Sequence, residues 1–290
     1  MPILQGFEER VVQTPGATIH AWTAGEGPPL LLLHGYPQTH AMWHKVAPRL
    51  AERYRVIAPD LRGYGKSGKP TGGERHVLYS KRAMAQDQAD LMRALGHSRF
   101  SVIGHDRGAR VAHRLALDHS ERIEKIVLLD IAPTDEMYRS TDKQFATAYY
   151  HWFFLIQPFD LPERLIGANP EYYLRRTLSS WCKTPGAITD EAMAEYVQAF
   201  SNPEAIHSAC EDYRAAADID LEHDNADRHR RLTQPLLALW GQAGVVGRMF
   251  DVLGAWRERA KDVRGKALPC GHFVAEEVPE LLLQELDHFL

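Results

Sequence analysis

Short, unbroken runs of apolar residues constrain the fold of this chain more than any other feature of its sequence. Turn residues bound each run, and the runs lie at residues 30–33, 54–59, 100–103, 126–130 and 236–240. Such runs are typical of strands that are buried on both faces of a parallel sheet. Residues 83–95 and 109–118 have helical periodicity, and strands that alternate with helices predict a mostly parallel, twisted sheet flanked by helices.

The two ends of the chain and a long middle segment complete this organisation. Residues 9–24 alternate around the turn at Pro15-Gly16, which predicts two early strands. After about residue 133 the strand pattern stops, and five prolines divide the segment into short helical pieces. We therefore expect an α/β core at residues 1–133, an inserted helical lid at 134–221 and the rest of the core at 222–290, with a helix near 248–260, a final strand near 266–268 and a C-terminal helix.

Composition and charge exclude several classes of partner. The formal net charge is −4 and no long block of like charge occurs, which argues against a nucleic-acid partner. No run of apolar residues is long enough to predict a membrane span, and the first residues lack the pattern of a secretory signal. The three cysteines match no metal site, so we expect reduced thiols in a cytoplasmic protein.

The segment Gly104-His105-Asp106-Arg107-Gly108 follows an expected strand and opens an expected helix. Small residues on both sides of a central residue permit the tight turn of a nucleophile elbow, which exposes that residue at the helix N-terminus. The central residue here is an aspartate. The alternative, that Asp106 merely caps the helix, does not account for both glycines. A carboxylate in this position indicates a nucleophile that attacks carbon and forms an ester.

Hydrolysis of such an ester requires a base that activates water and an acid that orients the base. His272 follows the last expected strand, and this position distinguishes it from the other histidines, which are better explained as surface or core residues. In many relatives with this kind of elbow, the orienting acid follows the strand that ends at Gly241, but here that loop contains no acid until Asp251. The acid that remains is Asp130, at the end of an earlier expected strand. We therefore predict a catalytic set of Asp106, His272 and Asp130. The alternative for Asp130 is a helix cap or an ordinary loop residue.

These residues and their surroundings resemble the fluoroacetate (haloacetate) dehalogenases of the α/β-hydrolase superfamily. The resemblance covers essentially the whole chain and implies an α/β-hydrolase fold with an inserted helical lid. Ala109 departs from the family, in which a glycine often stands there, and we expect this change to be tolerated. The similar segments are HGYPQTHAMW (34–43) and DLRGYGKS (60–67), both shared with epoxide hydrolases and haloalkane dehalogenases, and GHDRGAR (104–110), VLLDIAPT (127–134), HWFFLIQP (151–158), CEDYRAAA (210–217) and CGHFVAEE (270–277).

Two arginines beside the nucleophile indicate an anionic substrate. Arg107 and Arg110 lie three residues apart at a helix N-terminus and therefore share a face. Guanidinium groups suit a substrate carboxylate, with bidentate geometry available. They should also keep Asp106 ionised, because nearby positive charge lowers the pKa of a carboxyl group. The alternative is that each arginine is solvated or paired within the core.

The resemblance also assigns side chains in the lid. It implies that His151, Trp152 and Tyr213 surround the departing halide, which suits fluoride because that poor leaving group needs hydrogen bonds as its charge develops. Without the resemblance, these three residues would be interpreted as core or surface residues. Trp181 is expected to line the lid, although aromatic packing explains it equally well.

Backbone groups near the nucleophile complete the predicted site. The N–H groups of Tyr36 and Arg107 are expected to form the oxyanion hole for ester hydrolysis. Pro37 has no N–H and donates nothing. Four further polar residues of these loops are expected to serve loop structure: His34, Asp60, Arg62 and His105.

These assignments predict hydrolytic dehalogenation of haloacetates such as fluoroacetate and chloroacetate to glycolate and halide. The ester on Asp106 is expected to be hydrolysed by water that His272 activates. We expect neither a metal nor an organic cofactor, and the resemblance implies a homodimer. The sequence does not rank fluoroacetate against chloroacetate or bromoacetate.

Three alternatives remain open at this point. An epoxide hydrolase also uses an elbow aspartate, but it opens the epoxide with lid tyrosines and needs no arginine pair. A haloalkane dehalogenase would have a tryptophan in place of Arg107. A non-catalytic ligand receptor on the same fold belongs to a different class, and the complete set of Asp106, Asp130 and His272 argues against it.

Overall fold

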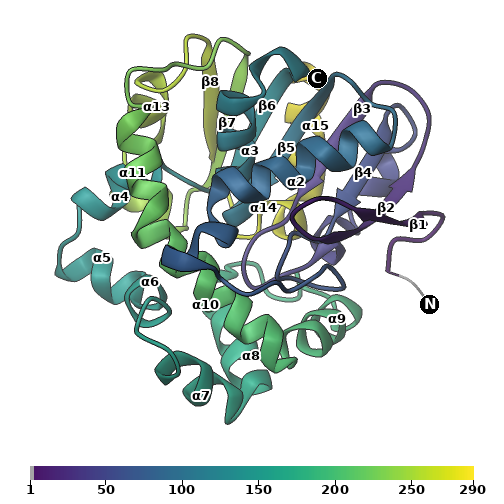
Figure 1. Cartoon of the computed structure of the whole chain (residues 1–290). Coiled ribbons are helices and arrows are strands. Elements are labelled where there is room, and N and C mark those ends of the chain that lie inside the picture. The colour runs from purple at the N-terminus through teal and green to yellow at the C-terminus, as the bar shows by residue number, and fades with distance from the viewer. Residues whose placement is uncertain (1–2) are drawn as a thin grey trace.

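The computed structural model describes residues 3–290 and contains one eight-stranded sheet (Figure 1). The strand order is β1-β2-β4-β3-β5-β6-β7-β8. From β4 to β8, neighbouring strands are parallel. Strand β2 is antiparallel to both of its neighbours, β1 and β4. The predicted mostly parallel sheet and the two early strands are therefore confirmed. The strands are β1 (Glu8–Gln13), β2 (Thr18–Ala24), β3 (Pro29–Leu33), β4 (Arg55–Pro59), β5 (Phe100–His105), β6 (Ile123–Leu129), β7 (Leu236–Gly241) and β8 (Val263–Leu268).

The central strands are buried because helices cover both faces of the sheet. The four leucines at residues 30–33 of β3 have no exposed surface. Leu33 is in register with Gly104 of β5, and His105 with Leu129 of β6, so the carboxyl ends of these strands meet at one edge. Helices α2 (Lys81–Ala94) and α3 (Arg107–Asp118) lie side by side in front of the sheet in Figure 1, with α15 behind it. The other core helices are α1 (Ala47–Leu50), α12 (Val245–Met249), α13 (Val252–Arg257), α14 (Val274–Glu277) and α15 (Pro279–Phe289).

A helical insertion separates β6 from β7 and gathers below the sheet in Figure 1. We call this segment, residues 134–226, the cap. The boundary predicted at residue 221 lies inside its last helix, because no glycine or proline marks a helix end there. The cap helices are α4 (Thr134–Arg139), α5 (Lys143–Ala148), α6 (Tyr150–Phe154), α7 (Leu161–Gly167), α8 (Pro170–Trp181), α9 (Asp190–Phe200), α10 (Pro203–Ala217) and α11 (Ile219–Ala226).

The helix predicted near residues 248–260 is confirmed in part, since α13 lies within this range but a separate short helix, α12, precedes it. Helix α12 ends at Met249, and Phe250 has an extended backbone. Asp251 then caps α13, because its side chain accepts a hydrogen bond from the backbone N–H of Gly254 at 3.0 Å. An aspartate that caps in this way begins a new helix instead of continuing the previous one.

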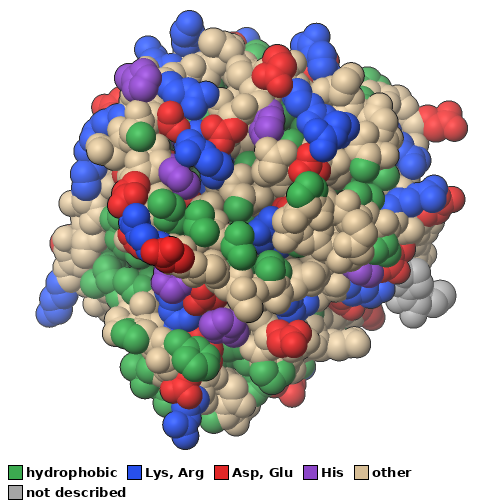
Figure 2. Space-filling view, viewed as in Figure 1, with side chains coloured by type: hydrophobic (Ala, Val, Ile, Leu, Met, Phe, Trp, Pro, Cys, Tyr) green, Lys and Arg blue, Asp and Glu red, His purple; other side chains and the backbone are tan. Residues whose placement is uncertain are grey.

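Three features of the described residues concern possible partners of the chain, namely a membrane, a metal ion and a nucleic acid. None of the helices within residues 3–290 is long and apolar enough to cross a membrane. The same residues contain no cluster of three or more His, Cys, Asp or Glu side chains arranged to hold a metal ion. On the face drawn in Figure 2, positive and negative side chains are interspersed, unlike a nucleic-acid-binding surface of one sign. The homodimer and the cytoplasmic location stay predictions.

Candidate active site

Asp106 stands on the sharp turn between β5 and α3. Its φ of +47° lies in the left-handed region, which residues other than glycine rarely adopt. A Cβ at Gly104 would lie 2.5 Å from the carbonyl oxygen of Gly108, and a Cβ at Gly108 would lie 2.3 Å from that of His34. Both glycines are therefore needed for this close packing. The side chain of Asp106 makes no capping hydrogen bond to α3, so the capping alternative does not hold.

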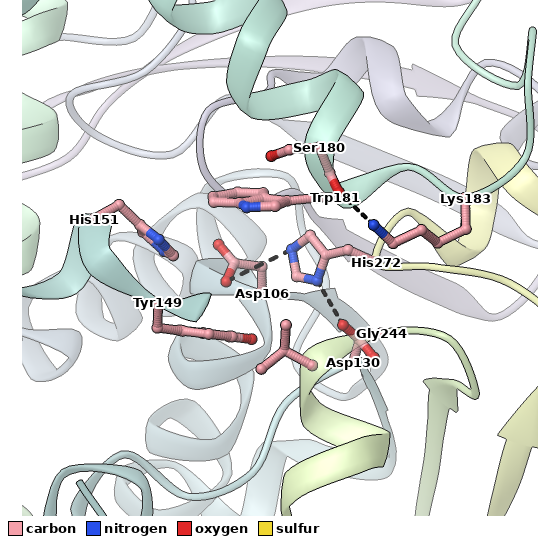
Figure 3. A pocket seen from close by; sticks show the side chains of 10 residues that line it. Asp106, Asp130, Tyr149, His151, Ser180, Trp181, Lys183, Gly244 and His272 are labelled. Atoms are coloured by element: carbon pink, nitrogen blue, oxygen red, sulfur yellow. Dashed lines mark hydrogen bonds and ion pairs between the residues drawn. The ribbon is translucent and has the colours of Figure 1, made fainter. Parts of the chain in front are cut away.

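One carboxylate oxygen of Asp106 is held by the backbone, and the other faces a histidine (Figure 3). Oδ1 accepts a hydrogen bond from the N–H of Tyr36 at 2.9 Å, and Oδ2 lies 3.9 Å from Nε2 of His272. Burial raises the pKa of Asp106, but the surrounding positive charge, with His272 first and both Arg107 and Arg110 included, outweighs it and lowers the pKa below 3.8. Asp106 is therefore ionised at neutral pH, as a nucleophile must be.

His272 and Asp130 form the second part of the site. Nδ1 of His272 lies 2.6 Å from Oδ2 of Asp130, while Oδ1 of Asp130 accepts the backbone N–H of Gly241 at 2.9 Å (Figure 3). Burial by itself lowers the pKa of His272, but the hydrogen bond and the charge of Asp130 raise it above 6.5. The structure thus brings Asp106, Asp130 and His272 together from the ends of three different strands.

Buried hydrogen bonds fix the loop that contains His272. Nε2 of His105 donates to the carbonyl oxygen of His272 at 2.8 Å, and burial lowers the pKa of His105 to about 3, so that ring is neutral. Glu277 accepts the backbone N–H groups of Gly271 and Phe273, each at 2.9 Å. It therefore holds both neighbours of His272. Sequence reasoning missed Glu277, and its only signal was a carboxylate five residues after the histidine.

Arg107 is fully buried and forms an ion pair with the carboxylate of Asp212. Nε lies 3.0 Å from Oδ2 and Nη2 lies 2.6 Å from Oδ1, so Asp212 occupies one whole edge of the guanidinium. Nη1 has no hydrogen-bond partner among residues 3–290. The expected bidentate grip by Arg107 is therefore unavailable in this arrangement, and among the described contacts only the two N–H bonds of Nη1 remain. Sequence reasoning missed Asp212, although an acid directly before Tyr213 was a signal.

Arg110 is buried without a carboxylate partner among the described residues. Nη1 donates to the carbonyl oxygen of Ala132 at 3.0 Å and to Oγ1 of Thr134 at 2.7 Å, and Nη2 contacts the sulfur of Met137 at 3.3 Å. Nε has no partner among residues 3–290. Burial, with the nearby charge of Arg107, lowers the pKa of Arg110. The site therefore contains a positive charge that forms no ion pair with a described side chain, although Asp106 lies near enough for each charge to influence the pKa of the other.

Three uncharged donors from the cap meet near Asp106. The ring of Tyr213, on α10, lies 5.7 Å from that of His151 and 6.5 Å from that of Trp152, both on α6. His151 Nδ1, Trp152 Nε1 and the Tyr213 hydroxyl are buried and have no hydrogen-bond partner within residues 3–290. Burial lowers the pKa of His151 to about 3 and raises that of Tyr213 well above 10. All three side chains therefore stay neutral at working pH.

A cavity of about 40 Å³ leads to the nucleophile. Trp181 borders it, with its ring 5.3 Å from that of His272 and 4.6 Å from that of His151 (Figure 3). The small volume suits a substrate of few atoms. The arginine pair, Trp152 and Tyr213 are buried and do not border this space. Its lining residues are Asp106, Asp130, Tyr149, His151, Ser180, Trp181, Lys183, Gly244, Val245 and His272.

The remaining polar loop residues make structural contacts. Nε2 of His34 accepts a backbone N–H at 3.0 Å. Asp60 accepts both the backbone N–H and Nδ1 of His40 at 2.9 Å. Arg62 is paired with the buried carboxylate of Asp87, with Nε 2.5 Å from Oδ2. These contacts fit the expectation that the loops next to the site are held by their own side chains.

Comparisons with known proteins show the family to which this fold belongs. The family model described as the alpha/beta hydrolase fold matches residues 28–279. A fluoroacetate dehalogenase from Burkholderia sp. is 44% identical over 289 residues, which are 99% of this chain and 95% of the relative. A soluble epoxide hydrolase from Corynebacterium sp. (strain C12) is 39% identical over 92% of each chain. A crystal structure from Nostoc sp. PCC 7120, provisionally classed as an alpha/beta hydrolase, is 60% identical with a TM-score of 0.97 and covers 99% of this chain and 98% of its own. The predicted fold and the resemblance are confirmed.

Proposed function

Because this chain belongs to the α/β-hydrolase family, we propose that it cleaves the carbon–halogen bond of haloacetates, including defluorination of fluoroacetate. Asp106 is the nucleophile, His272 the base that activates water and Asp130 the acid that orients the base. The similarity to a fluoroacetate dehalogenase supports this substrate class, and the similarity to an epoxide hydrolase makes the alternative specific enough to test.

The observation that carries the proposal is the buried charge of Arg110. A guanidinium in a dry interior is costly unless an anion or hydrogen bonds compensate it. Among residues 3–290, Arg110 forms hydrogen bonds only with neutral groups, and its Nε is unused. We infer that a substrate carboxylate supplies the missing charge and accepts from Nε of Arg110 and Nη1 of Arg107, once the side chains that separate these atoms from the cavity move apart. A neutral epoxide has no negative charge to compensate Arg110 and no carboxylate to accept these hydrogen bonds.

The first chemical step follows from the two oxygens of Asp106. Oδ1 is occupied by the N–H of Tyr36, so Oδ2 attacks the α-carbon of the haloacetate. The new carbon–oxygen bond forms as the carbon–halogen bond breaks, and its electron pair leaves with the halide. His151, Trp152 and Tyr213 donate hydrogen bonds to that halide, each from an atom without another partner.

The second step returns Asp106 to its starting state. Nε2 of His272 takes a proton from water as the water oxygen attacks the ester carbonyl, and Asp130 stabilises the resulting imidazolium. Oδ1 becomes the oxyanion, which the N–H of Tyr36 already contacts. The backbone N–H of Arg107 is the second proposed donor, since the first N–H groups of a helix lack helical partners. Collapse of this intermediate breaks the bond between Cγ and the ester oxygen, and the departing oxygen takes the proton held by His272. Glycolate leaves, and loss of the remaining proton to solvent restores the carboxylate of Asp106.

One observation favours epoxide hydrolysis as the second candidate. Tyr149 borders the cavity and Tyr213 lies near Asp106, so two cap tyrosines are available to donate to an epoxide oxygen. Burial raises the pKa of each well above 10, and both therefore keep their protons. A non-catalytic receptor has no such support, because the assembled Asp106, Asp130 and His272 would then serve no purpose.

The deciding experiment compares substrates side by side. Purified protein is incubated with fluoroacetate, chloroacetate and a small epoxide, and halide and diol are measured. We expect halide from both acids and little diol. Asp106→Asn serves as the inactive control. Diol formation without halide release would replace the proposed function with the epoxide alternative.

A further inference from the structure

We propose that a basic surface groove at the mouth of the active-site cavity is a collecting site for small carboxylate anions, which it concentrates before they reach Asp106. The groove measures about 290 Å³. Its lining includes Arg176 of α8, Lys183 of the following loop and Arg248 of α12, and no aspartate or glutamate. This inference rests on the proposed function, because only an anionic substrate would be attracted.

The groove and the cavity are continuous. Both are bordered by Ser180, Trp181, Lys183 and Val245, which places the groove directly outside the cavity that reaches Asp106. Figure 3 shows Lys183 at this rim, with its ammonium directed toward the backbone of Ser180. An anion that enters the cavity by way of the groove therefore passes the cationic side chains first.

The three cations are exposed and keep their charge free for a ligand. Lys183 donates to the carbonyl oxygen of Ser180, and Nε of Arg248 donates to that of Gly244 at 3.2 Å. Neither contact neutralises a positive charge, and within residues 3–290 no carboxylate pairs with Arg176, Lys183 or Arg248. By contrast, Arg175, next in sequence to Arg176, is paired with Glu171 at 2.7 Å.

Within residues 3–290, the acidic groups near the groove form no ion pair with its three cations. Asp142 lines a neighbouring groove together with Lys143 and Arg248, and its carboxylate caps α5 by accepting from the N–H of Phe145. Glu277 lies below Lys183 and accepts its backbone N–H at 2.8 Å, but it is buried. The protein as a whole has a net charge of −4. A local cluster of unpaired cations on such a protein is a distinct field that favours anions at this one opening.

The test compares neutralised variants with charge-matched controls. The triple variant Arg176→Gln, Lys183→Gln and Arg248→Gln is set against Arg93→Gln, Arg175→Gln and Lys266→Gln, which removes the same charge from ion pairs elsewhere on the surface. Initial rates of halide release from chloroacetate give kcat and kcat/KM at several ionic strengths. We expect the groove variant to lose roughly tenfold in kcat/KM at low salt, with a smaller change in kcat. The loss should shrink as salt screens the field.

Two outcomes would overturn the inference, and they are distinguishable. If wild type releases halide but the groove variant matches the control at every ionic strength, the collecting site is wrong and the proposed function stands. If wild type turns over only a neutral epoxide, both the collecting site and the proposed function are wrong. The single variants Arg175→Gln and Arg176→Gln provide the narrowest comparison, since they are neighbours on one helix and only Arg176 lines the groove.

Discussion

The carboxylate of Asp212 and the guanidinium of Arg107 meet through two parallel contacts, both fully buried. In the part of the chain that the structure describes, this pairing leaves Nη1 as the only guanidinium nitrogen of Arg107 that is free for a substrate. Cζ of Arg107 also lies 4.3 Å from the ring centre of Tyr213, the residue after Asp212. Helix α10 therefore positions both the arginine and a proposed halide donor.

Asp212→Asn should destabilise the protein strongly. The substitution leaves Arg107 and Lys81, which also contacts this carboxylate, buried without their shared anion. Breaking a buried pair in this way costs about 3–5 kcal/mol. Glu171→Gln, which breaks the exposed pair with Arg175, should cost less than about 1 kcal/mol. Urea denaturation measures both, and equal small losses would show that the buried pair contributes no more than the exposed one.

The arginine pair should make the enzyme selective for acids over amides. Chloroacetate should be a substrate and chloroacetamide a poor one, because the amide cannot neutralise Arg110. Arg110→Met should lower kcat/KM for chloroacetate by about 10- to 100-fold, the range expected for a hydrogen bond to a charged group, and should leave chloroacetamide unchanged. Equal turnover of acid and amide by wild type would count decisively against a carboxylate site.

Loss of one cap donor should affect fluoride more than bromide. Tyr213→Phe should reduce halide release from fluoroacetate by about 10²–10³, as for other donors to developing charge, and from bromoacetate by less, since bromide needs less help to leave. Tyr79→Phe is the matched control, because its hydroxyl is buried but donates to Pro70 outside the site. A uniform loss across halides would assign Tyr213 a structural role.

The two chemical steps should respond differently to pH. Ester hydrolysis should slow as pH falls through the pKa of His272, since only the neutral ring accepts a proton from water. Burial lowers that pKa, but Asp130 raises it above 6.5, so Asp130→Asn should move the midpoint of this loss to lower pH. The pKa of Asp106 is lowered below 3.8 despite burial, so halide release should persist where hydrolysis has slowed. Rapid-quench measurements separate the steps, and an unmoved midpoint in Asp130→Asn would argue against the orienting role.

His272→Asn should release halide once per active site and then stall. The histidine is needed for hydrolysis but not for attack by Asp106, so mass spectrometry should find a carboxymethyl group on Asp106. In wild type, a single turnover in ¹⁸O water should leave the label on Asp106 and give glycolate that is almost unlabelled. Fully labelled glycolate from the first turnover would mean that water attacks the substrate directly and that Asp106 is a general base.

Local patterns in the sequence were sufficient to predict the strands, the turn at Asp106 and a carboxylate as the proposed nucleophile. The apolar run at residues 30–33 predicts a buried strand because no polar face interrupts it, and the glycines around Asp106 predict a turn because a Cβ would not fit. The helix near residues 248–260 was predicted but its start was not, since the capping contact of Asp251 with Gly254 decides where α13 begins.

Only the tertiary structure decided which groups satisfy one another. Asp212 and Arg107 are 105 residues apart, and nothing in the periodicity of either segment indicates that the acid occupies one edge of the guanidinium. The same holds for Glu277, which fixes the loop of His272, and for the cations that α8 and α12 bring to one opening. Periodicity reports which face of an element is buried, whereas the partner of a buried charge depends on how distant elements pack and on the free energy of leaving that charge unpaired.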